Sequence, residues 1–239
     1  MSWNAHIITG FPTMFPGTLG ESLAGRARED GLWSLTTHDV RAHGQGKHKN
    51  IDDTPAGGGA GMVMRADVAA SALDSVTAQH NLPVLLPSPR GVPWTQDLAQ
   101  ELAEGAGAIF FCNRYEGIDE RFIEARAPLE VSLGDYILSG GEPAALVMLD
   151  SIIRLLPGVM GKVESGLQES FSAQSGGLLE HPQYTRPQVW EGMEVPEVVI
   201  SGDHEKIAKW RHQRALEITQ ERRPDLLEDL PQNDSKSKK

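Results

Sequence analysis

Apolar residues alternate between two spacings along the first two-thirds of the chain. Short runs rich in apolar and β-branched residues predict strands at residues 6–11, 32–40, 83–89, 108–113 and 128–133. Between these runs, apolar residues recur at intervals of three and four, which predicts helices at residues 18–30, 65–80, 94–105 and 117–127. This alternation is typical of an α/β fold, so we expect a mostly parallel sheet covered by helices on both faces.

The same order of elements predicts where a ligand would bind. In open parallel sheets the ligand site lies outside the carboxyl ends of the strands. The loops that follow the third, fourth and fifth predicted strands would therefore share one edge, and all three are rich in glycine, proline and polar residues. Their convergence is the first indication of a site.

Local signals mark the ends of several segments. Thr95 is expected to cap the helix that follows it. A helix from Glu142 to Leu156 is expected to end at Pro157-Gly158, and another is expected at residues 203–224. The predicted organisation is a main domain (1–160), a flexible linker (161–177), a small, mainly helical C-terminal domain (178–231) and a disordered tail (232–239).

The amino-acid composition indicates in which cellular compartment the protein is expected. The chain has 239 residues, of which 39% are hydrophobic and 23% charged, as in globular proteins. It contains no apolar run near the ~18 residues of a membrane span, and no basic leader with a small-residue cleavage site. Cys112 is its single cysteine, which excludes an internal disulfide and a cysteine-rich zinc site. We expect a cytoplasmic protein without a membrane partner.

The net charge is only weak evidence about nucleic-acid binding. The formal charge of −11 disfavours bulk binding to RNA or DNA, but recognition depends on where the positive charge lies. Basic residues are concentrated near residues 47–49 and along the helix predicted at 203–224. The latter stripe is either a solvated helix face or a surface for phosphates.

Glycines 57, 58, 59 and 61 form a loop that suggests phosphate binding but does not match its motifs. The segment "TPAGGGAGMVM" fits neither G-x-x-x-x-G-K-[ST] nor G-x-G-x-x-G. A flexible surface loop and a close approach of backbone to a flat ligand both remain open. The eight histidines show no metal-ligand spacing, and no metal-binding residue is assigned.

The turn at Asn113–Gly117, "NRYEG", is a stronger candidate. Charged and aromatic residues follow directly on an apolar strand there, and such strand-to-helix turns often carry function. Cys112 just before it is interpreted as a buried core residue rather than a nucleophile. Arg154 is either a helix-end arginine or a cation facing a site, and Glu164 and Glu169 are either solvated linker acids or part of a site completed by substrate.

Taken together, the motifs resemble one family over nearly the whole chain. After the opening "IITGFPTMF", eight follow in order between residues 57 and 227: "GGGAGMVM", "PSPRG", "RYEGIDERF", "GDYILSGGE", "RLLPGV", "HPQYTRP", "VPEVVISGDHEKIAKWR" and "RRPDLL". This series closely resembles the bacterial tRNA (guanine-N1-)-methyltransferases, the TrmD family of the SPOUT class. The resemblance implies an α/β fold with a deep trefoil knot, and an obligate homodimer whose active sites are built from both subunits.

The resemblance also implies the reaction. The family transfers methyl from S-adenosylmethionine to the guanine at tRNA position 37, beside the anticodon, and needs a divalent ion, expected to be Mg²⁺, for which no site is assigned. Two alternatives stay open: another SPOUT-class methyltransferase acting on ribosomal RNA or a ribose 2′-hydroxyl, and a noncatalytic RNA-binding protein with this fold.

Three loops are expected to hold the cofactor by analogy with the family. S-adenosylmethionine has no phosphate, so it needs backbone hydrogen bonds to adenine, apolar packing and tolerance of a sulfonium. Glu116 could balance the positive methyl donor. The expected cofactor residues are Leu86, Pro87, Ser88, Pro89, Asn113, Arg114, Tyr115, Glu116, Gly117, Leu133, Gly134, Asp135, Tyr136, Ile137, Leu138, Gly140 and Gly141.

The chemistry and the family pattern then point to catalytic residues. Guanine N1 must lose a proton before it attacks, so a general base is needed, with a cation for the charge on O6. Arg154 matches the family's arginine. The family's linker aspartate falls on Glu169, one methylene longer, with Glu164 as the alternative. Asn113 stands where the family has glycine.

The tRNA is expected to contact the glycine loop and the C-terminal helix. By the resemblance, the basic stripe would grip phosphates of the anticodon arm. Trp190 and Trp210 are interpreted as core residues of the small domain. The expected substrate-binding residues are Gly58, Gly59, Lys206, Lys209, Arg211 and Arg214.

Overall fold

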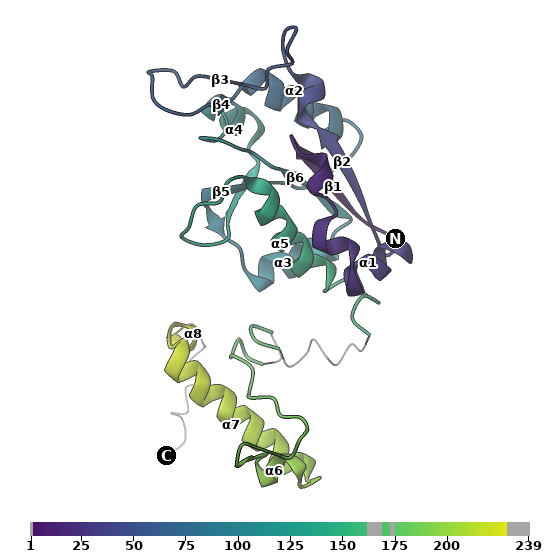
Figure 1. Ribbon diagram of the computed structural model, residues 1–239, viewed down its shortest axis with the longest axis vertical. Coiled ribbons are helices and arrows are strands. Elements are labelled where there is room, and N and C mark those ends of the chain that lie inside the picture. Colours follow the sequence, from purple (N-terminus) through teal and green to yellow (C-terminus); the bar gives the residue numbers. More distant parts are fainter. Residues whose placement is uncertain (1, 162–168, 173–174, 229–239) are drawn as a thin grey trace, which may run out of the picture. The chain divides into compact units, whose positions relative to one another are not determined.

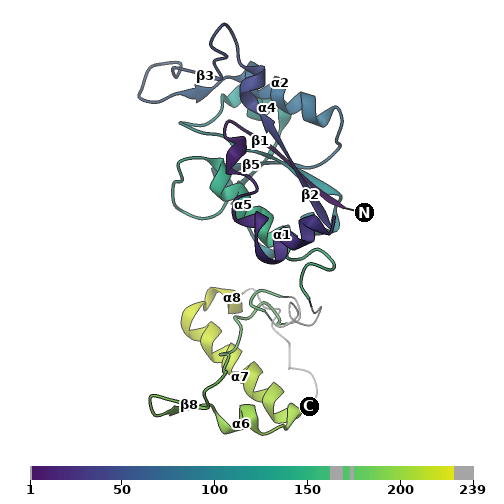
Figure 2. The same ribbon diagram turned by 45° about the vertical axis from the view of Figure 1, so that its right-hand side comes forward.

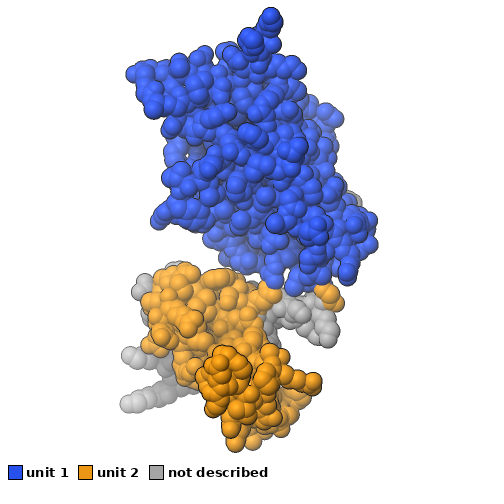
Figure 3. Space-filling model, viewed as in Figure 1, with its two compact units in different colours: residues 1–160 blue, residues 161–239 orange. Residues whose placement is uncertain are grey.

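The computed structural model describes residues 2–161, 169–172 and 175–228 (Figure 1). Two compact units divide the chain, residues 1–160 and residues 161–239 (Figure 3), and each is described by itself. The tail expected at 232–239 lies outside the described residues, as does most of the segment expected to be a linker.

The central sheet of the first unit has five strands in the order β2-β1-β6-β5-β7, and every neighbouring pair is parallel. This confirms the mixed α/β prediction with a mostly parallel sheet. The pairing of β5 with β7 shifts between Pro87 and Val92, where β5 leaves regular geometry. The strands are β1 (Trp3–Thr9), β2 (Trp33–Asp39), β5 (Val84–Pro93), β6 (Gly107–Phe111) and β7 (Leu129–Ser132).

Helices cover both faces of the sheet and form a separate core on each (Figure 1). On one face lie α1 (Ser22–Glu29), α3 (Gln96–Glu104) and α5 (Gly141–Ile153); on the other lie α2 (Ala66–Thr77) and α4 (Glu120–Arg126). Figure 2 shows the same two layers from a second direction. Strand β6 serves both cores, since Phe110 faces the first and Ile109 and Phe111 face the second.

Side-chain caps fix where helices begin. Thr95 Oγ1 accepts a hydrogen bond of 3.2 Å from the Leu98 amide at the start of α3, which confirms the predicted cap. Asp119 plays the same part for α4 by accepting from the Arg121 amide at 3.0 Å. Each cap satisfies one of the free amide donors in the first turn of its helix.

Short elements between β1 and α2 were not predicted from the sequence. They lack a run long enough to show a period, so spacing carries no signal for them. They are the 3₁₀ helices η1 (Pro12–Met14), η2 (Gly17–Gly20) and η3 (Val40–His43) and the strands β3 (Asp52–Asp53) and β4 (Val63–Met64).

The second unit is built around one long helix, α7 (His204–Arg222), capped by Asp203, which accepts from the Lys206 amide at 3.1 Å. A hairpin of β8 (Val189–Trp190) and β9 (Met193–Glu194) precedes it, together with α6 (Glu197–Ile200), and α8 (Asp225–Glu228) follows. No helix in the described ranges is long and apolar enough to cross a membrane.

The two tryptophans of the second unit differ in environment. Trp190 is 57% exposed, so its prediction as a core residue was wrong: the two-residue strands of this hairpin bury little side-chain surface. Trp210 is half-buried, and its ring centroid lies 6.1 Å from that of Tyr184.

Candidate functional site

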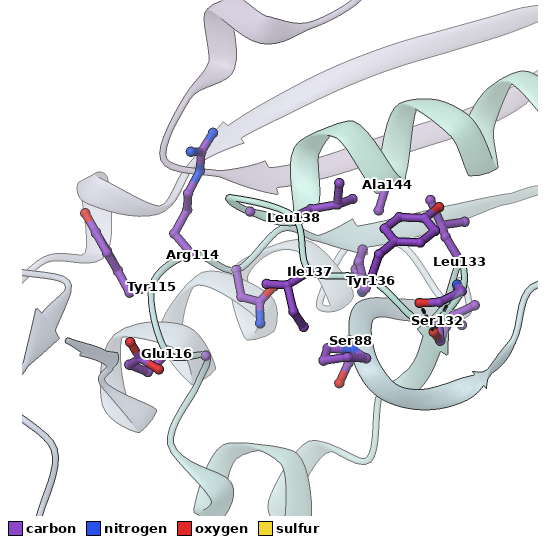
Figure 4. A pocket seen from close by; sticks show the side chains of 18 residues that line it. Ser88, Arg114, Tyr115, Glu116, Ser132, Leu133, Tyr136, Ile137, Leu138 and Ala144 are labelled. Carbon is purple, nitrogen blue, oxygen red and sulfur yellow. Dashed lines mark hydrogen bonds between the residues drawn. The ribbon is translucent and has the colours of Figure 1, made fainter. Parts of the chain in front are cut away.

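A pocket opens at the carboxyl ends of β5, β6 and β7, where the structure brings the three candidate loops together (Figure 4). Its volume is about 290 Å³. Tyr136 and Leu133 lie at one end of it, and Tyr115 and Glu116 at the other. It is lined by Pro87, Ser88, Pro89, Asn113, Arg114, Tyr115, Glu116, Gly117, Val131, Ser132, Leu133, Gly134, Tyr136, Ile137, Leu138, Gly140, Gly141 and Ala144.

Two of the residues expected to bind cofactor are not part of this lining. Leu86 is 1% exposed; it packs in the core on the α2 and α4 face of the sheet and lines a second, neighbouring cavity instead. Asp135 is exposed and lies outside the wall. Sequence reasoning missed Val131, Ser132 and Ala144, which flank the expected loops at the end of β7 and in the first turns of α5. The alternation of side chains along β7 and the helical spacing in α5 could have indicated that these flanking positions face the pocket.

The glycines at the start of α5 allow two pocket loops to touch. A Cβ on Gly141 would lie 3.0 Å from Cys112 Cα, and one on Gly140 would lie 2.5 Å from Arg114 Nε. The Gly141 amide donates to the Asn113 carbonyl at 2.8 Å. These glycines therefore serve loop packing as well as any approach of ligand.

A buried ion pair joins the same two loops. Arg114 Nε lies 2.9 Å from Glu142 Oε2, and the Glu142 side chain is fully buried while that of Arg114 is 23% exposed. Glu142 stands in the first turn of α5, where the helix dipole favours negative charge. Sequence reasoning placed Glu142 at the helix start but did not assign it to the site.

Cys112 precedes these loops and is a core residue, as predicted. It is 1% exposed at the end of β6. Burial raises the pKa of its thiol well above the ordinary value, and the nearby Glu142 carboxylate raises this pKa further. The thiol is therefore not activated as a nucleophile.

A second cavity of about 1230 Å³ shares a wall with the pocket. The residues common to both linings are Ser88, Pro89, Asn113, Glu116 and Gly117. Its other side is formed by residues 53–56 and 63–67, held against the turn after β6: the Glu116 amide donates to the Met62 carbonyl at 3.0 Å, and the Met64 amide to the Gly117 carbonyl at 2.9 Å.

The glycine loop borders this region without lining either cavity. Gly58 and Gly59 have φ values of +84° and +129°, and a Cβ on either would meet nothing within 4 Å. Gly61 is different, because a Cβ there would lie 2.5 Å from the Glu116 side chain. The glycines therefore give this loop its backbone shape and let its end approach Glu116.

The residues expected to be catalytic belong to different parts of the chain. Arg154 follows the last turn of α5, at the end opposite Gly141, and is not among the described residues that line either cavity. Glu169 belongs to the second unit, where its carbonyl accepts from the Ser172 amide at 3.2 Å. Glu164 lies outside the described residues.

The basic residues of α7 are largely paired with acids of the same segment. Lys206 Nζ lies 3.0 Å from Asp203, Lys209 Nζ lies 2.7 Å from Glu205, and Arg214 pairs with Glu217. Arg211 forms no ion pair with the described residues. In residues 2–161, 169–172 and 175–228, no group of three or more His, Cys, Asp or Glu side chains could hold a metal ion.

The fold and pocket define an α/β protein with a pocket at the carboxyl edge of a parallel sheet. A family model, tRNA (Guanine-1)-methyltransferase TrmD, matches residues 3–229, and the chain belongs to this family of methyltransferase enzymes. Its relatives include proteins named tRNA (guanine-N(1)-)-methyltransferase from Rhizobium johnstonii, 58% identical over 99% of this chain and 96% of its own, and from Chelativorans sp., 60% identical over 95% of each chain. A Brucella ovis relative of the same name is 58% identical over 95% of this chain and 92% of its own.

Proposed function

We propose that this protein transfers a methyl group from S-adenosylmethionine to N1 of the guanine at tRNA position 37. The observation that carries the proposal is the match to one methyltransferase family over residues 3–229, whose named relatives share 57–60% identity with nearly the whole chain. The pocket at the sheet edge supplies a place for the methyl donor.

The residues of the pocket fit this donor chemically. When bound, S-adenosylmethionine supplies a methyl group on a positively charged sulfur. The wall combines apolar side chains at Leu133, Ile137 and Leu138 with backbone groups for an adenine edge. Glu116 provides a carboxylate at the wall shared with the second cavity. This position suits the balancing of a cation beside the incoming base.

Glu169 and Arg154 are proposed to act on the target guanine. Glu169 would accept the N1 proton as a carboxylate general base. The Arg154 guanidinium would stabilise the negative charge that grows on O6 as that proton leaves. Glu164 remains the alternative base.

The position of Arg154 supports a site shared between two subunits. Along α5 the pocket-lining residue nearest to Arg154 is Ala144, ten residues earlier. At 1.5 Å per residue this places about 15 Å of helix between the arginine and the pocket of its own chain. In a symmetric dimer, the arginine of one subunit could reach the pocket of the other. This separation supports the expected homodimer.

Other parts of the family pattern remain predictions. They are the trefoil knot, the cytoplasmic location, the Mg²⁺ requirement, to which we assign no residue, and the division into linker, tRNA-binding domain and tail. The α7 residues Lys206, Lys209, Arg211 and Arg214 are proposed to contact phosphates of the anticodon arm, in exchange for the ion pairs that three of them now form. Gly58 and Gly59 are proposed to approach the target base.

A labelled-methyl assay tests the proposed reaction. The protein is incubated with methyl-labelled S-adenosylmethionine and two tRNA transcripts that differ only in guanine or adenine at position 37. We expect label at N1 of the guanine transcript and none on the adenine transcript. Label on a ribose hydroxyl, or transfer to neither transcript, would contradict the proposal.

A further inference from the structure

Four residues next to the pocket form a closed ring of contacts. Thr9 Oγ1 donates to Glu142 Oε1 at 2.8 Å, and Glu142 Oε2 accepts from Arg114 Nε at 2.9 Å. The Arg114 guanidinium lies over the Phe11 ring, 4.3 Å from its centroid, and the Phe11 amide donates to Thr9 Oγ1 at 2.9 Å. Each of the four residues therefore contacts two other members of the ring.

The ring connects three separate parts of the sheet edge. Thr9 ends β1, Arg114 follows β6, and Glu142 opens α5. Arg114 also pairs with Gly140 as an antiparallel bridge, so that the loops 113–117 and 133–141 are joined at this point. Of the four members only Arg114 lines the pocket.

Burial makes these contacts strong and directional. Thr9 and Glu142 are both 0% exposed, so water cannot substitute for a lost partner. Because the Thr9 oxygen already accepts from the Phe11 amide, its proton is directed to Glu142. Removing one member would leave a buried carboxylate or hydroxyl with one partner fewer, and the Arg114 side chain would lose part of what holds it.

We propose that Thr9, Phe11 and Glu142 are positioning residues, which fix Arg114 and hold two of the three pocket loops in the arrangement that binds the methyl donor. This inference rests on the proposed assignment of the pocket to S-adenosylmethionine. Binding energy for a small ligand depends on loops that are already ordered, since ordering them on binding costs affinity. The network performs that ordering without touching the ligand, except through Arg114.

Calorimetric titration of S-adenosylmethionine into the full chain tests the network. Thr9→Val keeps the shape of the side chain and removes the hydroxyl, whereas Thr9→Ser keeps both hydrogen bonds. We expect Thr9→Val and Glu142→Gln to raise Kd about tenfold or more, and Thr9→Ser to bind like the wild type. The double variant should be less than additive, because both changes break one network.

A matched control uses the ion pair of Asp74 and Arg126, which join at 2.6 Å on α2 and α4 away from the pocket. Asp74→Asn makes the same kind of change as Glu142→Gln, and its Kd should equal that of the wild type. Thermal unfolding, followed in parallel, separates stability from positioning. A lowered Tm with an unchanged Kd in both Thr9→Val and Glu142→Gln would overturn the inference.

The outcomes also separate this inference from the proposed function. If the wild-type protein does not bind S-adenosylmethionine, the assignment of the pocket fails. If the wild type binds and the network variants bind equally well, only the positioning role fails. Should Thr9→Val not fold, Phe11→Leu provides a second test, since it removes the ring 4.3 Å from the Arg114 guanidinium at a position outside the pocket lining.

Discussion

His6 Nδ1 lies 3.1 Å from His38 Nε2 across the neighbouring parallel strands β1 and β2. The ring of His80, just beyond α2, lies 4.0 Å from that of His6, centroid to centroid. His6 is only 6% exposed. Burial, followed by the proximity of His80 and His38, lowers the pKa of His6 to about 4. The three rings form a cluster that protonation of His6 in acid should disrupt.

The cluster predicts a loss of stability below pH 6.5. A depressed histidine pKa means that the unfolded chain takes up a proton before the folded chain does, so folding stability is complete above about pH 6.5 and falls as the pH drops toward 4. With these values, His6 should lower the free energy of unfolding by about 1 kcal/mol between pH 7.5 and 5.5. Urea unfolding at the two pH values measures this difference.

A substitution at His6 should reduce the pH dependence. His6→Gln has no titrating group, so its free energy of unfolding should change less between pH 7.5 and 5.5 than that of the wild type. His48→Gln, at an exposed position, serves as the control and should keep the wild-type difference. An unaltered pH dependence in His6→Gln would show that other groups cause the effect.

Cys112 is predicted to be unreactive in the folded protein. Its side chain is 1% exposed and burial raises its thiol pKa, so little thiolate is present at pH 8 and reagents cannot reach it. Iodoacetamide should modify the native protein at least about 100-fold more slowly than the urea-unfolded chain, as followed by mass spectrometry. Rapid labelling of the native protein would contradict the burial of this strand end.

Glu169→Gln should strongly reduce turnover while cofactor binding remains. An amide cannot accept the N1 proton, so we expect kcat to fall by about 10²–10⁴. Kd for S-adenosylmethionine should stay at the wild-type value, because the proposed donor pocket is formed by the first unit. Glu164→Gln is the direct comparison: full turnover in Glu169→Gln with a loss in Glu164→Gln would transfer the role of the base to Glu164.

Features of the fold that depend on local spacing or on strand order could be predicted from the sequence. Long periodic segments such as residues 65–80 and 94–105 gave the helices α2 and α3, because burial of one helix face imposes a spacing. The convergence of loops at the sheet edge followed from parallel topology alone. These inferences needed no knowledge of distant contacts.

Contacts between distant segments could not be predicted in this way. The ring of Thr9, Phe11, Arg114 and Glu142 joins residues up to 133 positions apart, and no spacing indicates such a meeting. The exposure of Trp190 was missed for a related reason: composition suggests burial of a tryptophan, but only the packing around a short hairpin decides it.

A mixture of two inactive variants should regain activity if the site is shared. Gly141→Val is expected to block the pocket, since a Cβ there already lies 3.0 Å from Cys112 Cα, and Arg154→Met removes the proposed cation at the far end of α5. In a heterodimer, one site would combine the intact pocket of one chain with the intact arginine of the other. Random mixing makes about half of all dimers heterodimers. Each heterodimer has one working site out of two, so about a quarter of wild-type activity should return.

The control for complementation uses both substitutions in one chain. Mixed with the wild type, the double variant still forms heterodimers, but each of their sites then carries one defect. Activity above that of the residual wild-type homodimers would therefore contradict a shared site. Circular dichroism of Gly141→Val verifies that the variant is folded, and co-purification of two differently tagged chains verifies that dimers form. Recovery in the first mixture without such an excess in the second would support the action of Arg154 on the pocket of the partner subunit, because about 15 Å of helix separates it from the pocket of its own chain.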